Sequence, residues 1–255
     1  MRNLLVLFGL SVTLLAQPAA TPQKLELFLL IGQSNMAGRG KVEPQDAAPI
    51  AGIWALGKDD QWKPAVDPLH WDKPDVAGVG LGRTFAKTLQ ERNPGAQIGL
   101  IPAAFGGTSL EQWKVGGELY TEAIRRARVA MKNGRIRGML WHQGEAESGK
   151  EELAKTYRAR WTVIIQSMQK ELGLEGVPVV VGQLGRFLVK EKQPFADLVN
   201  QEEALLPLSY PHTAFVSTEG LKDKGDSVHF DSASARELGR RYALAFLGLD
   251  AGWGK

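Results

Sequence analysis

The sequence predicts an α/β fold in which a parallel sheet of five strands is covered by helices on both faces. Short apolar runs alternate with segments of helical periodicity, so that strand and helix follow each other five times. The runs break into polar turns that contain glycine, as strand-to-helix connections do. No linker, repeat or low-complexity tract divides the 255 residues, so we expect a single domain over residues 21–255.

Stop signals separate the expected elements in chain order. A buried strand over 27–31 precedes residues 40–74, which lack a sustained period and are expected to form an irregular loop. Helices over 79–92 and 118–132 end at Asn93-Pro94 and Asn133-Gly134, and a helix over 151–172 ends at Gly173. The other expected elements are strands over 97–101, 138–141, 177–181 and 213–216, and helices over 195–206 and 232–247.

The N-terminus has the parts of a secretory signal peptide. Arg2 supplies the positive charge, the apolar run Leu4–Ala16 follows, and small residues come after it. This run is shorter than the roughly 20 residues that span a bilayer, although a retained anchor is the alternative interpretation. We therefore expect residues 1–20 to be removed, leaving a secreted or periplasmic chain without a membrane span.

Composition excludes several kinds of chemistry. The chain has no cysteine, so it has no thiol nucleophile, disulfide or cysteine-based metal site. The net charge of +3 is modest, and no aromatic residues or binding motif accompany the basic residues, so we expect no nucleic-acid partner. We interpret one basic cluster as a solvated helix face: Arg125, Arg126, Arg128, Lys132, Arg135 and Arg137.

Ser34 is the first candidate for a catalytic residue. The apolar run ends at Ile31, and the chain then breaks into Gly32-Gln33-Ser34, which places a hydroxyl just past the carboxyl end of a strand. Ligands bind at this edge of open α/β sheets, so Ser34 is a candidate nucleophile. The alternative is that Ser34 only caps the helix that follows.

Asp226 and His229 supply the base that such a nucleophile needs. With this spacing the carboxylate can accept from one imidazole nitrogen while the other faces Ser34. Only four histidines occur, at positions 70, 142, 212 and 229, and only His229 has this spacing at the expected edge. A surface histidine beside an acidic residue is the alternative interpretation.

Two further turns at this edge could stabilise an oxyanion. The turn over residues 105–109 contains Gly106 and Gly107, which let backbone N–H groups approach a ligand closely. Gln143 follows the strand over 138–141 and could add a side-chain amide donor. Alternatively, Gln143 is a structural residue that joins two loops.

Four blocks follow one another along the chain: Gly32-Gln33-Ser34-Asn35-Met36, Phe105-Gly106-Gly107-Thr108-Ser109, Trp141-His142-Gln143-Gly144-Glu145 and Asp226-Ser227-Val228-His229-Phe230. In this order they resemble the SGNH hydrolase superfamily. The closest resemblance is to its carbohydrate acetylesterase branch, which includes carbohydrate esterase family six and the sialate O-acetylesterase-like proteins. Asp67-Pro68-Leu69-His70 extends the similarity, which covers essentially the whole chain after the signal peptide.

The resemblance implies a flavodoxin-like three-layer fold with Ser34 as nucleophile, His229 as base and Asp226 as the acid that orients it. It also implies an oxyanion hole made of the Ser34 and Gly107 N–H groups and the Gln143 side chain. Glu145 is a second candidate for the acid of the triad. We prefer Asp226, because it shares one short loop with His229.

The function expected from the resemblance is removal of O-acetyl groups from carbohydrates through an acetyl-enzyme. The alternatives are a GDSL-like lipase or thioesterase that acts on longer acyl chains, and a carbohydrate-binding protein that has lost turnover. No cofactor is implied, and His142 with Glu145 and Glu147 fits known metal-ligand spacings poorly. Four tryptophans on expected loops offer flat faces suited to a sugar ring, although each one taken alone is more typical of a core or loop-packing residue: Trp54, Trp62, Trp71 and Trp113.

Overall fold

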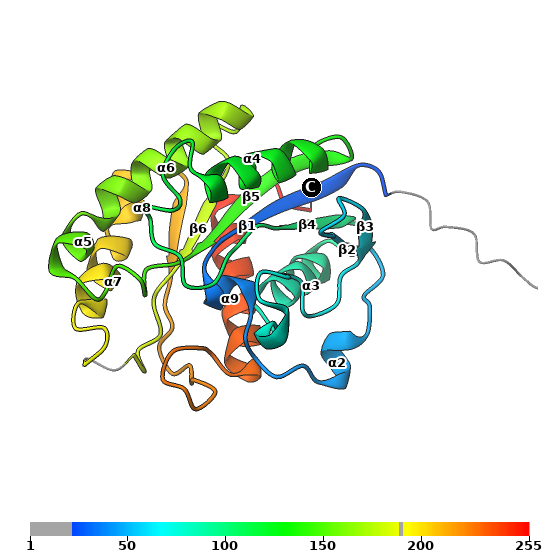
Figure 1. Ribbon diagram of the computed structural model, residues 1–255. Helices are drawn as coiled ribbons and strands as arrows, with labels where there is room; N and C mark the ends of the chain where they lie inside the picture. The colour runs from blue at the N-terminus through cyan, green and yellow to red at the C-terminus, as the bar shows by residue number, and fades with distance from the viewer. Residues whose placement is uncertain (1–21, 189–190, 255) are drawn as a thin grey trace, which may run out of the picture.

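A seven-stranded sheet forms the centre of the computed structural model, which describes residues 22–188 and 191–254 (Figure 1). The strand order is β3-β2-β4-β1-β5-β6-β7. All neighbouring strands are parallel except β3, which runs antiparallel to β2. The strands are β1 (Leu25–Gly32), β2 (Ile53–Leu56), β3 (Trp62–Pro64), β4 (Ile98–Pro102), β5 (Gly134–His142), β6 (Val179–Gly182) and β7 (Thr213–Val216).

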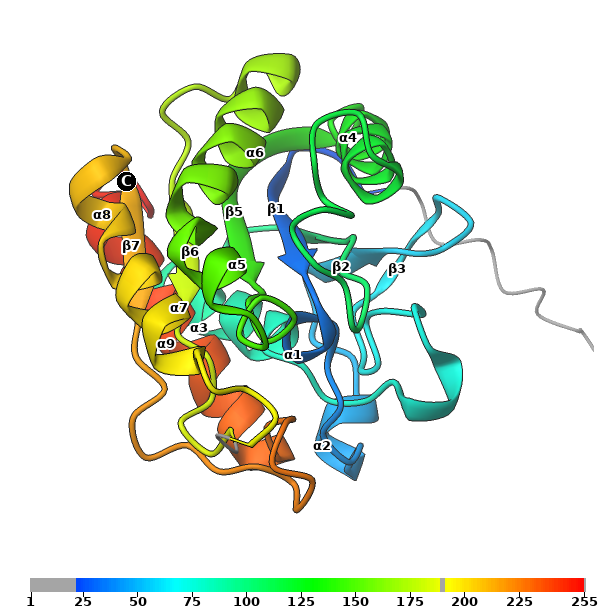
Figure 2. The same ribbon diagram turned by 60° about the vertical axis from the view of Figure 1, so that its left-hand side comes forward.

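Helices cover both faces of this sheet, as Figures 1 and 2 show from two sides. The longer helices are α3 (Gly82–Arg92), α4 (Glu118–Ala130), α6 (Tyr157–Leu172), α7 (Ala196–Ala204) and α9 (Ser232–Leu249). Short helices complete the described part: α1 (Ser34–Ala37), α2 (Pro44–Ala47), η1 (Pro74–Val76), α5 (Glu151–Lys155) and α8 (Leu206–Ser209). The predicted signal peptide, residues 1–20, lies outside the described residues.

The alternation of side chains along β1 explains the three layers. Leu27 and Leu29 pack with α4 and α6 in one hydrophobic cluster, whereas Phe28 and Leu30 pack with α3 and α9 in a second cluster. Successive strand residues point to opposite faces, so a strand that is apolar throughout must be covered on both sides. The central position of β1 therefore follows from its sequence, and the predicted three-layer fold class is confirmed.

The predicted number of strands is wrong, because the sheet has seven strands rather than five. The two additional strands, β2 and β3, lie in the region expected to be an irregular loop. β2 gains its hydrogen bonds from β4, where Trp54 aligns with Gly99, and β3 is only three residues long. Their pairing depends on partners distant in sequence, and local periodicity does not report it.

Two expected helices are interrupted. The helix over 151–172 divides at Thr156, whose hydroxyl donates to the carbonyl of Glu152 at 2.8 Å. A threonine that bonds back to the preceding turn bends a helix. The helix over 195–206 divides at Leu205 into α7 and α8.

Candidate active site

The turn after β1 presents Ser34 at the carboxyl edge of the sheet. Gly32 has φ +130°, and a Cβ there would lie 2.1 Å from the carbonyl oxygen of His142, so only glycine fits beside β5. Ser34 is the first residue of α1, and the N-cap position before it belongs to Gln33. The Ser34 hydroxyl lies 3.0 Å from Nε2 of His229. The hydroxyl is therefore placed for proton transfer and not for helix capping.

The loop between β7 and α9 carries the imidazole and its carboxylate. Asp226 Oδ2 lies 2.7 Å from Nδ1 of His229, while Oδ1 accepts from the N–H groups of Val228 and His229. Burial works to raise the pKa of Asp226, but these hydrogen bonds outweigh it and hold the pKa below its usual range. Asp226 is therefore ionised at neutral pH and fixes the imidazole with Nε2 toward Ser34.

Asn35 connects the nucleophile turn to this histidine loop. Its Nδ2 donates to the carboxylate of Glu145 at 2.6 Å and to the carbonyl of Val228 at 3.0 Å. Its Oδ1 accepts from the N–H of Phe230 at 3.2 Å. Asn35 thus holds the residues on both sides of His229, a role that the sequence pattern did not reveal.

Glu145 reaches the histidine loop only through Asn35. Its other oxygen, Oε2, has no hydrogen-bond partner among the described residues, and burial raises the pKa of the carboxyl. The carboxylate that contacts the ring of His229 belongs to Asp226. The two candidate acids therefore lie in different surroundings: Asp226 bonds to the imidazole of His229, and Glu145 bonds to the amide of Asn35.

The turn over residues 105–109 supplies backbone donors beside Ser34. Gly107 has φ +80°, which favours glycine, and a Cβ on Gly106 would lie 2.4 Å from Arg39 and 3.4 Å from Cβ of Ser34. The Gly106 N–H donates to Asp72 at 2.7 Å. In the described part of the chain, the N–H groups of Ser34 and Gly107 form no hydrogen bond. These two donors are free to stabilise an oxyanion.

A buried ion pair supports the turn over residues 105–109. Arg39 lies 2.5 Å from the carboxylate of Asp72, and both side chains are nearly inaccessible to solvent. The same oxygen of Asp72 accepts the Gly106 N–H. Neither residue was predicted to belong to the site, because their contacts with the turn bridge more than thirty positions.

The side chain of Gln143 is already engaged. Its Nε2 donates to the carbonyl of Thr108 at 3.0 Å and to the carboxylate of Glu147, which uses both amide hydrogens. Its Oε1 is buried without a partner among the described residues. Gln143 therefore joins the turn over 105–109 to the end of β5, and its role as an oxyanion donor stays a prediction.

The weak metal candidate does not form a cluster. Nδ1 of His142 lies 3.0 Å from the hydroxyl of Tyr242, while Glu145 and Glu147 bond to amides. Within residues 22–188 and 191–254, no three side chains of suitable type are grouped to hold a metal ion. A search of the same residues found no helix with the length and apolar character of a membrane span.

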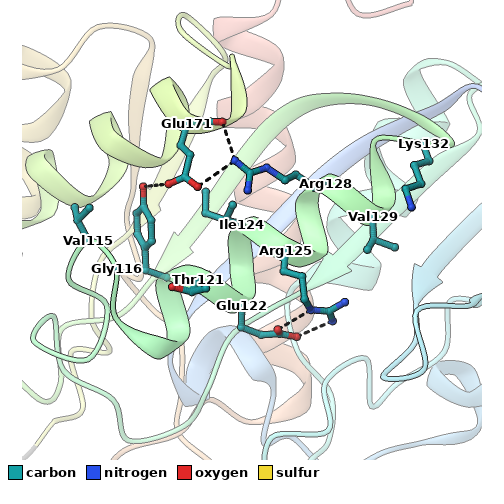
Figure 3. A pocket seen from close by; sticks show the side chains of 11 residues that line it. Val115, Gly116, Thr121, Glu122, Ile124, Arg125, Arg128, Val129, Lys132 and Glu171 are labelled. Carbon is teal, nitrogen blue, oxygen red and sulfur yellow. Dashed lines mark hydrogen bonds and ion pairs between the residues drawn. The ribbon is translucent and has the colours of Figure 1, made fainter.

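The basic cluster on and after α4 is largely paired with acids. A surface cavity of about 580 Å³ lies along α4, and Figure 3 shows Arg128 beside Glu171 and Arg125 beside Glu122. The hydroxyl of Tyr120 also bonds to Glu171. The interpretation as a solvated face is wrong for Arg126, which is 1% exposed. It donates to carbonyls at the ends of β2 and β4, so it has a structural role.

Of the four tryptophans, one lines a cavity near the site. Trp113 is fully buried, and Trp54 and Trp62 pack against the core from β2 and β3. Trp71 lines a cavity beside the turn that begins at Phe105.

Comparison with known proteins shows the family to which the chain belongs. Residues 24–248 match the family model described as "Carbohydrate esterase, sialic acid-specific acetylesterase". A protein of Arabidopsis thaliana described as a "Probable carbohydrate esterase" is 32% identical over 87% of this chain and 90% of its own. An X-ray structure of an Arabidopsis thaliana protein has a TM-score of 0.81 at 30% identity, covering 88% of this chain and 98% of the other.

Two more distant structures share the fold. The crystal structure of NanS has a TM-score of 0.73 at 19% identity, over 89% of this chain and 98% of its own. A carbohydrate acetylesterase from Xanthomonas citri has a TM-score of 0.67 at 21% identity, over 89% of this chain and 57% of its own. By the family model and the Arabidopsis relative, the chain belongs to the carbohydrate esterase family of sialic acid-specific acetylesterases and is a carboxylic ester hydrolase.

Proposed function

We propose that this protein is a serine esterase that removes O-acetyl groups from carbohydrates through an acetyl-enzyme. The observation that carries the proposal is the chain of contacts from Ser34 Oγ to His229 at 3.0 Å and from His229 to Asp226 at 2.7 Å. A hydroxyl, an imidazole and a carboxylate in this order are the components of nucleophilic acyl transfer.

In the proposed reaction, Ser34 Oγ attacks the acetyl carbonyl carbon while Nε2 of His229 takes the hydroxyl proton. Asp226 stabilises the imidazolium, and the Ser34 and Gly107 N–H groups bind the oxyanion. The ester bond to the sugar then breaks, and the sugar oxygen leaves with the proton from His229. Water attacks the acetyl-serine with His229 again as base, which releases acetate and restores the serine.

We assign positioning roles to the residues around this chain. Asn35, supported by Glu145, holds the loop that carries His229. The pair of Arg39 and Asp72 holds the glycine turn against Ser34. Neither group contacts the reacting atoms in this scheme, and each acts by fixing the residues that do.

The proposed location is outside the cytoplasm, with residues 1–20 as a cleaved signal peptide. The support is the order of charge, apolar run and small residues at the N-terminus. N-terminal sequencing of the protein from the periplasm and the culture medium tests this part. Recovery of chains that begin at Met1 from both fractions would refute it.

The activity is tested by measuring acid release from a panel of acetylated polysaccharides and sugars. Wild-type protein should release acetate from at least one of them, and Ser34→Ala should not. An octanoyl ester run in parallel separates this proposal from a lipase or thioesterase. Preferential turnover of the octanoyl ester, or full activity of Ser34→Ala, would refute the proposal.

A further inference from the structure

We propose that a cavity beside the glycine turn binds the sugar ring of the substrate, with Trp71 as its aromatic wall. This inference rests on the proposed function and names the part of the substrate that the cavity holds. Its volume is about 260 Å³, below the roughly 300–1,000 Å³ of sites for drug-sized ligands. The size suits one ring rather than an oligosaccharide.

The cavity lies beside the glycine turn, which stands between it and the nucleophile. One wall is the end of β4 and the residues that follow it, as far as Phe105. The next residue, Gly106, packs against Ser34. Asp72 both lines the cavity and accepts the Gly106 N–H at 2.7 Å. A group bound in the cavity is therefore separated from the reacting serine by a single turn of backbone.

Trp71 is held in one orientation. The guanidinium carbon of Arg126 lies 4.5 Å from the centre of the Trp71 ring, within the range of a cation–π contact. Arg126 is itself fixed by its bonds to the carbonyls of Pro102 and Leu56, at 2.8 and 2.7 Å. An aromatic ring fixed before binding loses little conformational entropy when a ligand contacts it.

The lining suits a sugar better than an acyl chain. Phe105 is 41% exposed and gives the cavity a second aromatic surface beside Trp71. Charged side chains complete the wall: Lys58, Asp72, Glu122 and Arg126. Of these, Lys58 and Glu122 are exposed and can bond to sugar hydroxyls, whereas a hydrocarbon chain would remove them from water without compensation.

The test compares two acetyl esters in the full-length protein by titrating released acid. One is a fully acetylated methyl glucoside, and the other is ethyl acetate, whose leaving group has no ring to place in the cavity. For Trp71→Ala, the ratio of kcat/KM for the glucoside to kcat/KM for ethyl acetate should fall about 10-fold, mainly through KM. Phe105→Ala should lower the ratio in the same direction.

Trp54→Ala is the matched control, because Trp54 is also partly buried but packs from β2 outside the cavity. It should leave the ratio at the wild-type value. Trp71→Phe, which keeps a ring, should restore part of the ratio and guards against a misfolded alanine variant. An unchanged ratio in both Trp71→Ala and Phe105→Ala would overturn the inference.

Trp71→Ala could instead change the preference for octanoyl over acetyl ethyl esters and leave the ratio of glucoside to ethyl acetate unchanged. This result would also overturn the inference, because it would assign the cavity to the acyl chain. Failure of the proposed function looks different. In that case Ser34→Ala hydrolyses both esters as well as wild type does, whatever the result at Trp71.

Discussion

Asn35 shows how much a single side chain contributes to the geometry of this site. It bonds to Glu145, Val228 and Phe230, and so connects the nucleophile turn to the loop of His229. From the sequence it was only part of a motif with no chemical role of its own. Its three contacts bridge more than one hundred positions, and short-range patterns carry no information about such contacts.

The two candidate acids differ in what their replacement should do. Asp226→Asn removes the charge that orients and stabilises the His229 ring, so kcat should fall at least about 100-fold. Glu145→Gln keeps an oxygen acceptor for Asn35, so kcat should fall less than about 10-fold. Steady-state kinetics on one acetyl ester compares them. An equal loss in both variants would contradict the assignment.

Coupling between Asn35 and Glu145 is also measurable. Asn35→Ala leaves a buried carboxyl without its partner, so it should lower the free energy of unfolding by about 1–3 kcal/mol and reduce kcat with little change in KM. In a double-mutant cycle with Glu145→Ala, which removes the acceptor, urea unfolding should show a coupling energy of at least about 0.5 kcal/mol. Strictly additive effects would show that the hydrogen bond contributes nothing.

At the level of elements, the turn after β4 requires glycine at Gly106 for lack of space and at Gly107 because of its positive φ. Gly106→Ala places a methyl group against Arg39 and Ser34, so kcat should fall at least about 10-fold. Gly116→Ala is the control, because Gly116 has φ +75° but open space around it. It should lower stability by about 1 kcal/mol and leave kcat unchanged. Equal losses of kcat would argue against the steric account.

The segment before η1 contains a buried acid that makes stability depend on pH. Burial raises the pKa of Asp67 to about 7, and its Oδ1 has no partner among the described residues. The folded chain therefore holds this proton up to about pH 7, whereas an unfolded chain releases it near pH 4. Because the folded state binds more protons in this window, the contribution of Asp67 to stability falls as pH rises from 4 to 7.

Asp67→Asn removes this dependence. The Tm of Asp67→Asn minus the Tm of wild type should be larger at pH 8 than at pH 4, by about 3 °C or more. Calorimetry at both pH values measures it. A difference in Tm that does not change with pH would contradict the raised pKa.

At the scale of the whole molecule, the order of strands and helices was predictable, except at the edge of the sheet that β2 and β3 form. The central strand β1 contains a continuous apolar run over residues 27–31, which the local sequence is enough to reveal. The edge strand β3 and its neighbour β2 are short and depend on pairing with each other and with β4. The sequence could place Ser34, Asp226 and His229 at one edge, because a parallel sheet collects its strand-to-helix turns there.

What could not be predicted is how the side chains share their hydrogen bonds. Gln143 has an amide suited to an oxyanion hole, yet its hydrogens bond to Thr108 and Glu147. Asp72 was expected to lie in a loop, yet it supports the Gly106 N–H. These outcomes depend on which polar groups are buried together, and that follows only from the assembled fold.

Trapping of the intermediate tests the central claim most directly. The protein is mixed with excess acetyl ester, quenched in acid within the first turnovers, digested and examined by mass spectrometry. The account predicts one added acetyl group on Ser34 in wild-type protein and none in Ser34→Ala. Two results would contradict the claim. One is rapid turnover with the acetyl group on a residue other than Ser34, and the other is rapid turnover by Ser34→Ala without any adduct.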